Sequence, residues 1–355
     1  LDPSYRIVYS STDKLDIPAG VEKLCALFDL LEPGSSAQLL KFLDEGKFKY
    51  EIGIHDLVHK PGLSVTEFLD MELFKGVFKL HVFESISSYI RKFFKDPKLV
   101  QLLEFPVLFL GAKPSNTPAL YSLMNYADMS LGTWYPMGGM SKVIDGMVSL
   151  ATSLGVHFEY NSNIQRVDLN STKAKGVVVN DKLQSFDYVV ASADYHHVEQ
   201  DLLPASHRRY SEQYWQKRVM APSSLIFYLG VNKKIDHLLH HTLFFDEDFT
   251  RHAEQIYDQP QWPTAPQFYV SCPSKTDPSV APEGHENIFI LIPVAPGLTD
   301  EETTRERYFE MVISRLERLI GQNIRNHIVF KRSYAHRDFV QDYNAFKGNA
   351  YGLAN

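Results

Sequence analysis

The spacing of hydrophobic residues changes along the chain, and this change restricts the fold more than any other feature. Up to about residue 131 the apolar residues mostly recur at helical spacing. The exception is a hairpin pattern, formed by Tyr5–Tyr9 and Lys14–Ile17 around a Ser/Thr/Asp turn. The helices expected in this first third are Gly20–Leu31, Ser35–Lys60 and Glu72–Phe94.

After residue 131 the pattern becomes mainly that of strands. Short β-rich runs predict a small sheet from Val156–Tyr160, Ile164–Leu169, Gly176–Val179 and Tyr188–Ala191. Further strands are expected at Leu225–Leu229, Phe268–Cys272, Ile288–Ile292 and His327–Tyr334. One helix is expected at Thr304–Ile320, with Thr303 and Glu306 at capping-box spacing and Gly321 as its C-terminal stop. The chain is therefore expected to be an α/β protein of mixed α+β type with more than one lobe.

Composition excludes several classes of protein. The 355 residues are 44% hydrophobic, which is enough for a sizeable core, and the net charge of −7 argues against a nucleic-acid partner. No apolar run reaches the roughly 18 residues that a membrane-spanning helix needs. The two distant cysteines, Cys25 and Cys272, argue against a disulfide framework and fit a reducing compartment such as the cytoplasm.

Three common motifs are absent from the sequence. It contains no G-x-G-x-x-G dinucleotide loop, no phosphate-binding G-x-x-x-x-G-K-[ST] loop and no G-x-S-x-G nucleophile elbow.

Two groups of histidines have spacings that could suit metal ligands. His55 and His59 have the spacing of a helical zinc site, but no third ligand follows, so an ordinary helix with two polar histidines is favoured. His237, His240 and His241 also cluster, and a buried or hydrogen-bonded pair near a strand start is favoured there. No metal is expected.

Three other features leave two interpretations open. Glu72–Lys95 interleaves bulky apolar residues with lysine and arginine, which fits either a membrane interface or a core helix with a charged face. In Trp134–Met140, the paired Gly138 and Gly139 indicate either a close backbone approach to a ligand or a tight turn before a helix at Ser141–Ser149. Asp96 is either a helix cap or salt-bridge partner, or a general base.

Ten segments together resemble one family. They are Phe94–Leu99, Phe105–Gly111, Pro118–Leu123, Gly132–Met140, Asn161–Ile164, Val189–Asp194, His240–Thr242, Ala281–Gly284, Asp338–Phe339 and Asn344–Ala350. In these segments the chain resembles the FAD-dependent carotenoid desaturases of the phytoene desaturase type, in order along its whole length. The resemblance implies a flavin amine-oxidase-like fold of two lobes.

The resemblance also implies where FAD would bind. Glycines 138 and 139 would let the flavin and the inner end of the substrate cavity come close to the backbone. The cofactor-binding residues that the family implies are Gly138, Gly139, Met140, Ile164, Ala193 and Asp194. Asp96 matches an acidic position proposed for acid–base chemistry, whereas Val100 stands where many relatives have arginine.

The resemblance implies four regions. Residues 1–131 would form a helical substrate and membrane-facing lobe with a β-hairpin, and residues 132–204 a partial FAD-binding lobe. Residues 205–343 would continue the substrate lobe, and residues 344–355 would begin a C-terminal FAD segment. Members of the family begin with a Rossmann βαβ unit and end with a further glycine-rich segment, so we expect this chain to be the interior of a longer flavoenzyme.

The expected reaction removes two hydrogens from adjacent carbons of a C40 isoprenoid such as phytoene, one as hydride and one as a proton. Such a hydrocarbon binds through apolar area, and the phenylalanines that could line its tunnel, or form an ordinary core, are Phe74, Phe78, Phe83, Phe93, Phe94, Phe105 and Phe109. Because the substrate dissolves in lipid, residues 72–95 are expected to attach a cytoplasmic enzyme to the membrane surface. The alternatives are a related carotenoid isomerase, oxygenase or saturase, and a non-catalytic lipid-binding protein.

Overall fold

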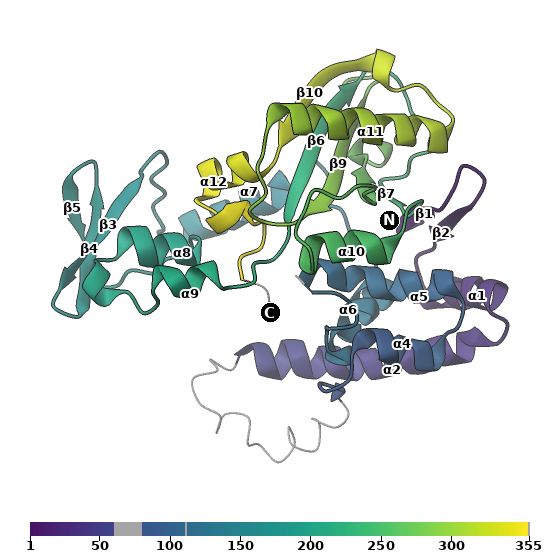
Figure 1. The fold of residues 1–355 in the computed structure, drawn as a ribbon, viewed down its shortest axis with the longest axis horizontal. Coiled ribbons are helices and arrows are strands. Elements are labelled where there is room, and N and C mark those ends of the chain that lie inside the picture. The colour runs from purple at the N-terminus through teal and green to yellow at the C-terminus, as the bar shows by residue number, and fades with distance from the viewer. Residues whose placement is uncertain (60–79, 111, 354–355) are drawn as a thin grey trace.

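A computed structural model describes residues 1–59, 80–110 and 112–353 (Figure 1). The described chain is a mixed α/β structure, as expected, and it is built around two sheets. The larger sheet has seven strands in the order β10-β6-β9-β8-β7-β1-β2. The smaller sheet, β3-β4-β5, projects to one side together with α8 and α9 (Figure 1).

The larger sheet combines strands from both ends of the chain. Strands β1 (Tyr5–Val8) and β2 (Lys14–Ile17) form the expected hairpin, and β1 pairs in parallel with β7 (His241–Phe244). The antiparallel remainder consists of β6 (Ser223–Val231), β8 (Phe268–Ser271), β9 (Glu286–Val294) and β10 (Ile328–Tyr334). The N-terminal region and residues 205–343 therefore share one sheet, while the division into four regions stays a prediction.

The two faces of this sheet are covered differently. Helix α11 (Glu302–Ile320) packs against one face, where Phe227, Ile290 and Leu316 are at most 1% exposed. Along β9 every second residue is buried, because successive side chains point to opposite faces of the pleated strand. The other face is only half-buried along β9, and helix α10 (Phe249–Tyr257) lies on that side.

A helical group packs beside the β1, β2 and β7 end of the sheet (Figure 1). Its helices are α1 (Val21–Leu31), α2 (Ser35–Glu51), α4 (Ile86–Phe93), α5 (Pro97–Glu104) and α6 (Leu123–Tyr126). The rings of Phe28, Phe42 and Phe94 meet edge to face at centroid distances of 5.4 and 5.9 Å, which fixes the mutual positions of α1, α2 and α4. Winding continues after α2 as a π turn at Ile52–Asp56 and a 3₁₀ turn at Leu57–His59.

The single helix expected over Glu72–Phe94 is wrong in its described part. The chain turns at His81, whose φ is +51°, and α4 begins only at Ile86. Ser85 caps α4, because its side chain accepts a hydrogen bond from the Ser88 amide at 3.2 Å. Apolar spacing alone does not show where a hydroxyl group satisfies the first amides of a helix and so starts a new one. The earlier part of this prediction lies outside the described residues.

The smaller sheet differs from the expectation at both ends. It contains β3 (Ile164–Asn170), β4 (Lys173–Val179) and the unexpected β5 (Lys182–Ser185). The strands expected at Val156–Tyr160 and Tyr188–Ala191 are wrong, because no strand forms at either place. Neither segment has a neighbouring strand to bond with in the described chain, and Val190 is 91% exposed. An apolar β pattern becomes a strand only where a second strand supplies its hydrogen-bond partners.

Four further α-helices lie after residue 140 in the described chain. They are α7 (Ser141–Ser153), which confirms the helix after the paired glycines, α8 (Tyr195–His197), α9 (Glu212–Gln216) and α12 (His336–Tyr343). Helix α11 ends at Gly321 as expected, with φ +70°. The expected capping box of Thr303 and Glu306 is wrong, because α11 has already begun at Glu302. The sequence interpretation did not include α10 or α12.

Candidate functional site

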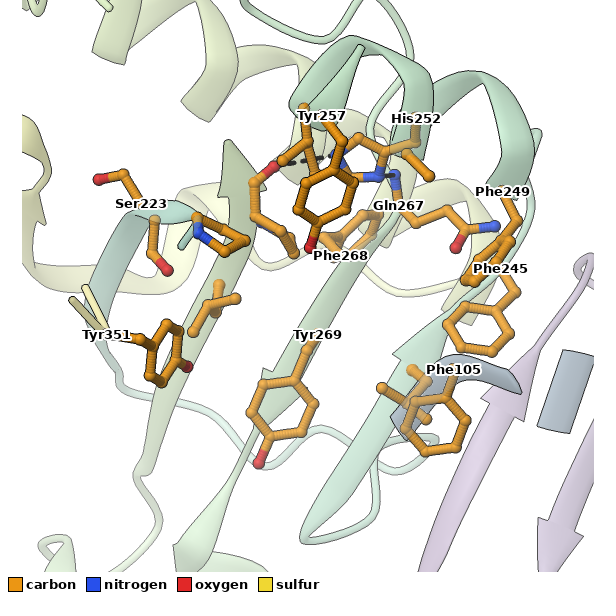
Figure 2. Close-up of a pocket in the computed structure, with 17 residues that line it drawn as sticks. Phe105, Ser223, Phe245, Phe249, His252, Tyr257, Gln267, Phe268, Tyr269 and Tyr351 are labelled. Carbon is orange, nitrogen blue, oxygen red and sulfur yellow. Dashed lines mark hydrogen bonds between the residues drawn. The ribbon is translucent and has the colours of Figure 1, made fainter. Parts of the chain in front are cut away.

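An apolar pocket lies between the half-buried face of the large sheet and α10 (Figure 2). Its empty space, open mouth included, amounts to about 710 Å³. Aromatic rings make up much of its wall: Phe105, Phe245, Phe249, Tyr257, Phe268, Tyr269 and Tyr351. They come from four separate parts of the chain, so only the folded sheet brings them together.

Strand register places one row of side chains on the pocket side of the sheet. Leu243 on β7 lies opposite Tyr269 on β8, which in turn lies opposite Leu291 on β9. Directly opposite residues of an antiparallel pair share a face, so all three side chains point into the pocket. Above this row, α10 contributes Phe249 and Ala253, which are four residues apart and therefore on one face of the helix.

Three buried polar side chains of the pocket wall, those of His252, Gln267 and Ser223, are hydrogen-bonded within the protein. The His252 ring bonds to the Pro293 carbonyl through Nε2 at 2.9 Å, and its Nδ1 accepts from the Gln267 amide at 3.2 Å. Burial lowers the pKa of His252 to about 4, so this histidine is neutral at pH 7. The Gln267 side chain donates to the Glu247 carbonyl, and the Ser223 hydroxyl donates to the Gly348 carbonyl. These bonds leave a wall suited to an apolar ligand.

Of the four described phenylalanine side chains that were expected to line a tunnel, three do not line this pocket. Phe105 lines it, whereas Phe93 and Phe94 belong to the core between helices and Phe83 is 93% exposed. Phe74, Phe78 and the side chain of Phe109 lie outside the described residues. Helical spacing shows which residues share a face but does not show whether that face meets a cavity or a neighbouring helix.

The paired glycines both have a backbone conformation that favours glycine. Gly138 and Gly139 have φ values of +90° and +97°, which side chains other than glycine rarely adopt. The Gly138 amide donates to Asp277 Oδ2 at 2.5 Å, and a Cβ at Gly139 would meet no atom nearer than 3.9 Å. The adjacent Met140 is 67% exposed. A Cβ at Gly138 would instead lie 3.0 Å from the Lys142 side chain, so the open backbone is that of Gly139, and the flavin contact expected at residues 138–140 stays a prediction.

The other residues expected to bind FAD lie at positions 164, 193 and 194. Ile164 is the first residue of β3, as expected, but Ala193 and Asp194 follow an irregular segment and not a strand. Asp194 caps α8, and its Oδ2 accepts a hydrogen bond from the Phe346 amide at 3.2 Å. His196 stacks on the Phe346 ring at a centroid distance of 4.0 Å. Asp194 therefore links residues 132–204 to the C-terminal segment 344–355. The Gly138 amide, by contrast, is bonded to Asp277.

Asp96 is the N-cap of α5. Its Oδ1 accepts hydrogen bonds from the backbone amides of Lys98 at 2.8 Å and Leu99 at 3.2 Å. Val100, at the position where many relatives have arginine, is buried among helical core residues. Asp96 does not line the apolar pocket. The structure thus shows a capping role for Asp96, and its catalytic role stays a prediction.

The histidine pair is hydrogen-bonded at a strand start, as the sequence indicated. His241 is the first residue of β7, and its Nδ1 lies 2.5 Å from the Tyr269 hydroxyl. The Nδ1 of His240 lies 2.9 Å from the Thr276 hydroxyl. Among the described residues, no three or more His, Cys, Asp or Glu side chains gather in a way that would hold a metal ion. The His55 side chain lies outside the described set.

No helix in the described ranges is long and apolar enough to cross a membrane.

Comparison with known proteins shows the family to which the chain belongs. The family model for flavin-containing amine oxidoreductases matches residues 2–354. The chain therefore belongs to this family of FAD-dependent oxidoreductases. A carotenoid 3,4-desaturase from Haloarcula japonica is 35% identical over 100% of this chain and 72% of its own length. Within the family, the chain belongs to the FAD-dependent carotenoid desaturases.

Two relatives of lower sequence identity are also desaturases by name. A zeta-carotene-forming phytoene desaturase from Myxococcus xanthus is 27% identical over 99% of this chain and 68% of its own length. A 4,4'-diapophytoene desaturase from Staphylococcus aureus is 27% identical over 98% of this chain and 72% of its own length. Among solved structures, a putrescine oxidase variant matches with a TM-score of 0.52 and 12% identity, covering 98% of this chain and 69% of its own. At that identity the match shows the fold alone.

Proposed function

We propose that this protein desaturates a long apolar isoprenoid, a carotenoid or a C40 precursor such as phytoene. The observation that carries the proposal is the aromatic pocket between β7, β8, β9 and α10. His252, Gln267 and Ser223, three buried polar residues of its wall, are already hydrogen-bonded within the protein, so a hydrocarbon can bind without leaving these groups unpaired. Apolar contact then contributes roughly 25 cal/mol per Å² of surface removed from water.

The open backbone of Gly139, with Gly138 and Met140 beside it, would hold the flavin close to the protein, and Ile164, Ala193 and Asp194 are the proposed contacts toward the rest of the cofactor. When bound, FAD would supply the hydride acceptor. The residues of this chain bind the substrate, orient it, exclude water from the pocket and take up the proton.

Product analysis tests this function. The full enzyme with FAD is incubated with liposomes that contain phytoene or, separately, a coloured carotenoid, and the pigments are separated by chromatography. We expect products that have lost two hydrogens per step and absorb at longer wavelength. An isomer of unchanged mass, an oxygenated product or a saturated one would instead indicate one of the related enzymes. Binding without conversion would indicate a lipid-binding protein.

The proposed acid–base role of Asp96 has a clean test, because asparagine caps helices as well as aspartate does. Asp96→Asn keeps the cap of α5 and removes the carboxylate. If Asp96 takes up the proton, product formation falls by roughly 10²-fold or more while the melting temperature is nearly unchanged. Product formation equal to that of the unmodified enzyme would leave Asp96 with its capping role alone.

We also propose that residues 80–95 contact the membrane surface. Phe83 is 93% exposed, and α4 carries Arg91 and Lys92 in its last turn. Arg91 and Lys92 are ion-paired with Glu104 and Glu84, so the exposed ring is the group that would enter the lipid interface. Co-sedimentation with anionic liposomes tests this, and Phe83→Ser should release a measurable share of the protein. Equal sedimentation of both proteins would place the contact elsewhere.

A further inference from the structure

His241 and Tyr269 form a hydrogen-bonded pair beside the apolar pocket, which Tyr269 lines and His241 does not. The Tyr269 ring lines the pocket, and its hydroxyl lies 2.5 Å from His241 Nδ1 (Figure 2 shows Tyr269). His241 is half-buried, and its second ring nitrogen, Nε2, has no hydrogen-bond partner among the described residues. When Nδ1 carries the proton and donates it to the tyrosine oxygen, Nε2 keeps a free lone pair.

A short series of contacts connects this pair to the paired glycines. The rings of His241 and His240 are 4.4 Å apart between centroids, and the Tyr135 ring meets the His240 ring edge to face at 4.5 Å. The Tyr135 hydroxyl lies 3.4 Å from Asp277 Oδ2, the oxygen that also accepts from the Gly138 amide. The same hydroxyl would lie 3.9 Å from a Cβ at Gly139. The histidine thus lies between the apolar pocket and the proposed flavin contact.

We propose that Nε2 of His241 accepts the proton that the substrate loses during desaturation, with Tyr269 holding the imidazole in the required tautomer. This inference rests on the proposed function. It replaces Asp96, which caps α5, as the residue for the proton step, so a large loss of turnover in Asp96→Asn at an unchanged melting temperature would contradict it.

The step balances with a flavin as the oxidant. One substrate carbon gives up a hydride, that is a hydrogen with both bonding electrons, to the oxidised flavin. The C–H bond on the adjacent carbon then breaks, its electron pair forms the new C=C bond, and its proton binds His241 Nε2. The imidazole becomes an imidazolium, which afterwards returns the proton to water.

A weakly basic histidine is sufficient for this step. Burial lowers the pKa of His241 to about 4, so the ring is neutral at pH 7 and free to accept a proton. Loss of a hydride leaves a carbocation, whose neighbouring C–H bonds are far more acidic than those of the hydrocarbon. The Tyr269 ring, which lines the pocket, supplies a π-system that stabilises such a cation.

The first test needs no flavin and no variant enzyme assay. The chain is labelled with ¹⁵N-histidine, the His241 resonances are assigned with a His241→Gln sample, and nitrogen shifts are measured at pH 7. We expect a neutral ring with the proton on Nδ1 and an unprotonated Nε2. A proton on Nε2 would overturn the proposal, because no lone pair would then face away from Tyr269.

The second test separates proton transfer from structural support in the holoenzyme. His241→Gln should lower kcat by at least 10²-fold with KM changed less than threefold. In His241→Gly, added imidazoles should restore turnover, and substituted imidazoles of equal size should differ in rate according to their pKa. His240→Gly is the matched control, and imidazoles should not restore whatever activity it loses. Rescue that is independent of pKa, or a His241→Gln enzyme within threefold of the unmodified one, would overturn the proposal.

The two proposals fail in different ways. If the unmodified enzyme forms no desaturated product, the proposed function is wrong. If it forms product and the His241 variants do so equally well, only the role of His241 is wrong.

Discussion

Helices α7 and α11 both carry several large apolar side chains, but these are exposed in α7 and buried in α11. In α11 nine residues are buried, and Val312, Ile313 and Leu316 pack into the core on one face of the large sheet. In α7 no residue is buried, and Met147 and Leu150 are more than 60% exposed. The two helices differ in what faces them: α11 lies on a seven-stranded sheet, whereas no described element covers α7.

The same contrast extends to the neighbouring segments. Strand β9 buries every second side chain against α11, whereas Tyr188 and Val190, which have a similar apolar β pattern, are almost fully exposed and form no strand. An apolar pattern therefore indicates a surface that favours burial, and a second element must be present to bury it. Three predictions use this contrast between the covered and the uncovered regions.

The largest effect is expected from a core truncation. Leu316→Ala removes a side chain that is 0% exposed and leaves a cavity between α11 and the sheet, so the free energy of unfolding should fall by about 2–5 kcal/mol. Leu150→Ala on α7 is the matched control, and it should change stability by less than about 0.5 kcal/mol. Urea unfolding of both variants measures the difference. Equal losses would mean that α7 is covered in solution.

A pH-dependent loss of stability is expected from the covered region. Burial lowers the pKa of His252 from 6.5 to about 4, so between these values the unfolded chain binds a proton that the folded chain does not. This contribution to stability is complete above pH 6.5 and falls as the pH drops to 4, by about 3 kcal/mol. Urea unfolding at several pH values measures it, and His252→Gln should flatten the curve. An unchanged slope in that variant would assign the loss to other groups.

The smallest effects are expected from two glycines near α7, with opposite signs. Gly139 has φ +97°, so Gly139→Ala should destabilise by about 1–2 kcal/mol through backbone strain. Gly146 lies within α7, and an added methyl group there would meet no atom within 4 Å, so Gly146→Ala should stabilise by about 0.5–1 kcal/mol. Thermal unfolding of the pair gives both signs. Stabilisation by Gly139→Ala would show that this backbone is not held in its strained form.

Parts of the site could be predicted from the sequence because their signals are local. Paired glycines next to each other indicate positive φ, and Gly138 and Gly139 both have it. An aspartate followed by proline is a strong helix-start signal, and Asp96 is the cap of α5. The pocket wall could not be predicted, because Phe105, Leu243 and Tyr351 meet only after distant segments have packed together.

The sequence by itself determined the elements whose causes lie within a few residues: the β1–β2 hairpin, the helix stop at Gly321 and the strands that alternate buried and exposed side chains. Its resemblance to carotenoid desaturases also determined the family. Only the tertiary structure decided which apolar faces became core, which became the wall of a pocket and which stayed exposed. The physical reason is that burial depends on a second surface, and the residues of that surface lie far away in the sequence.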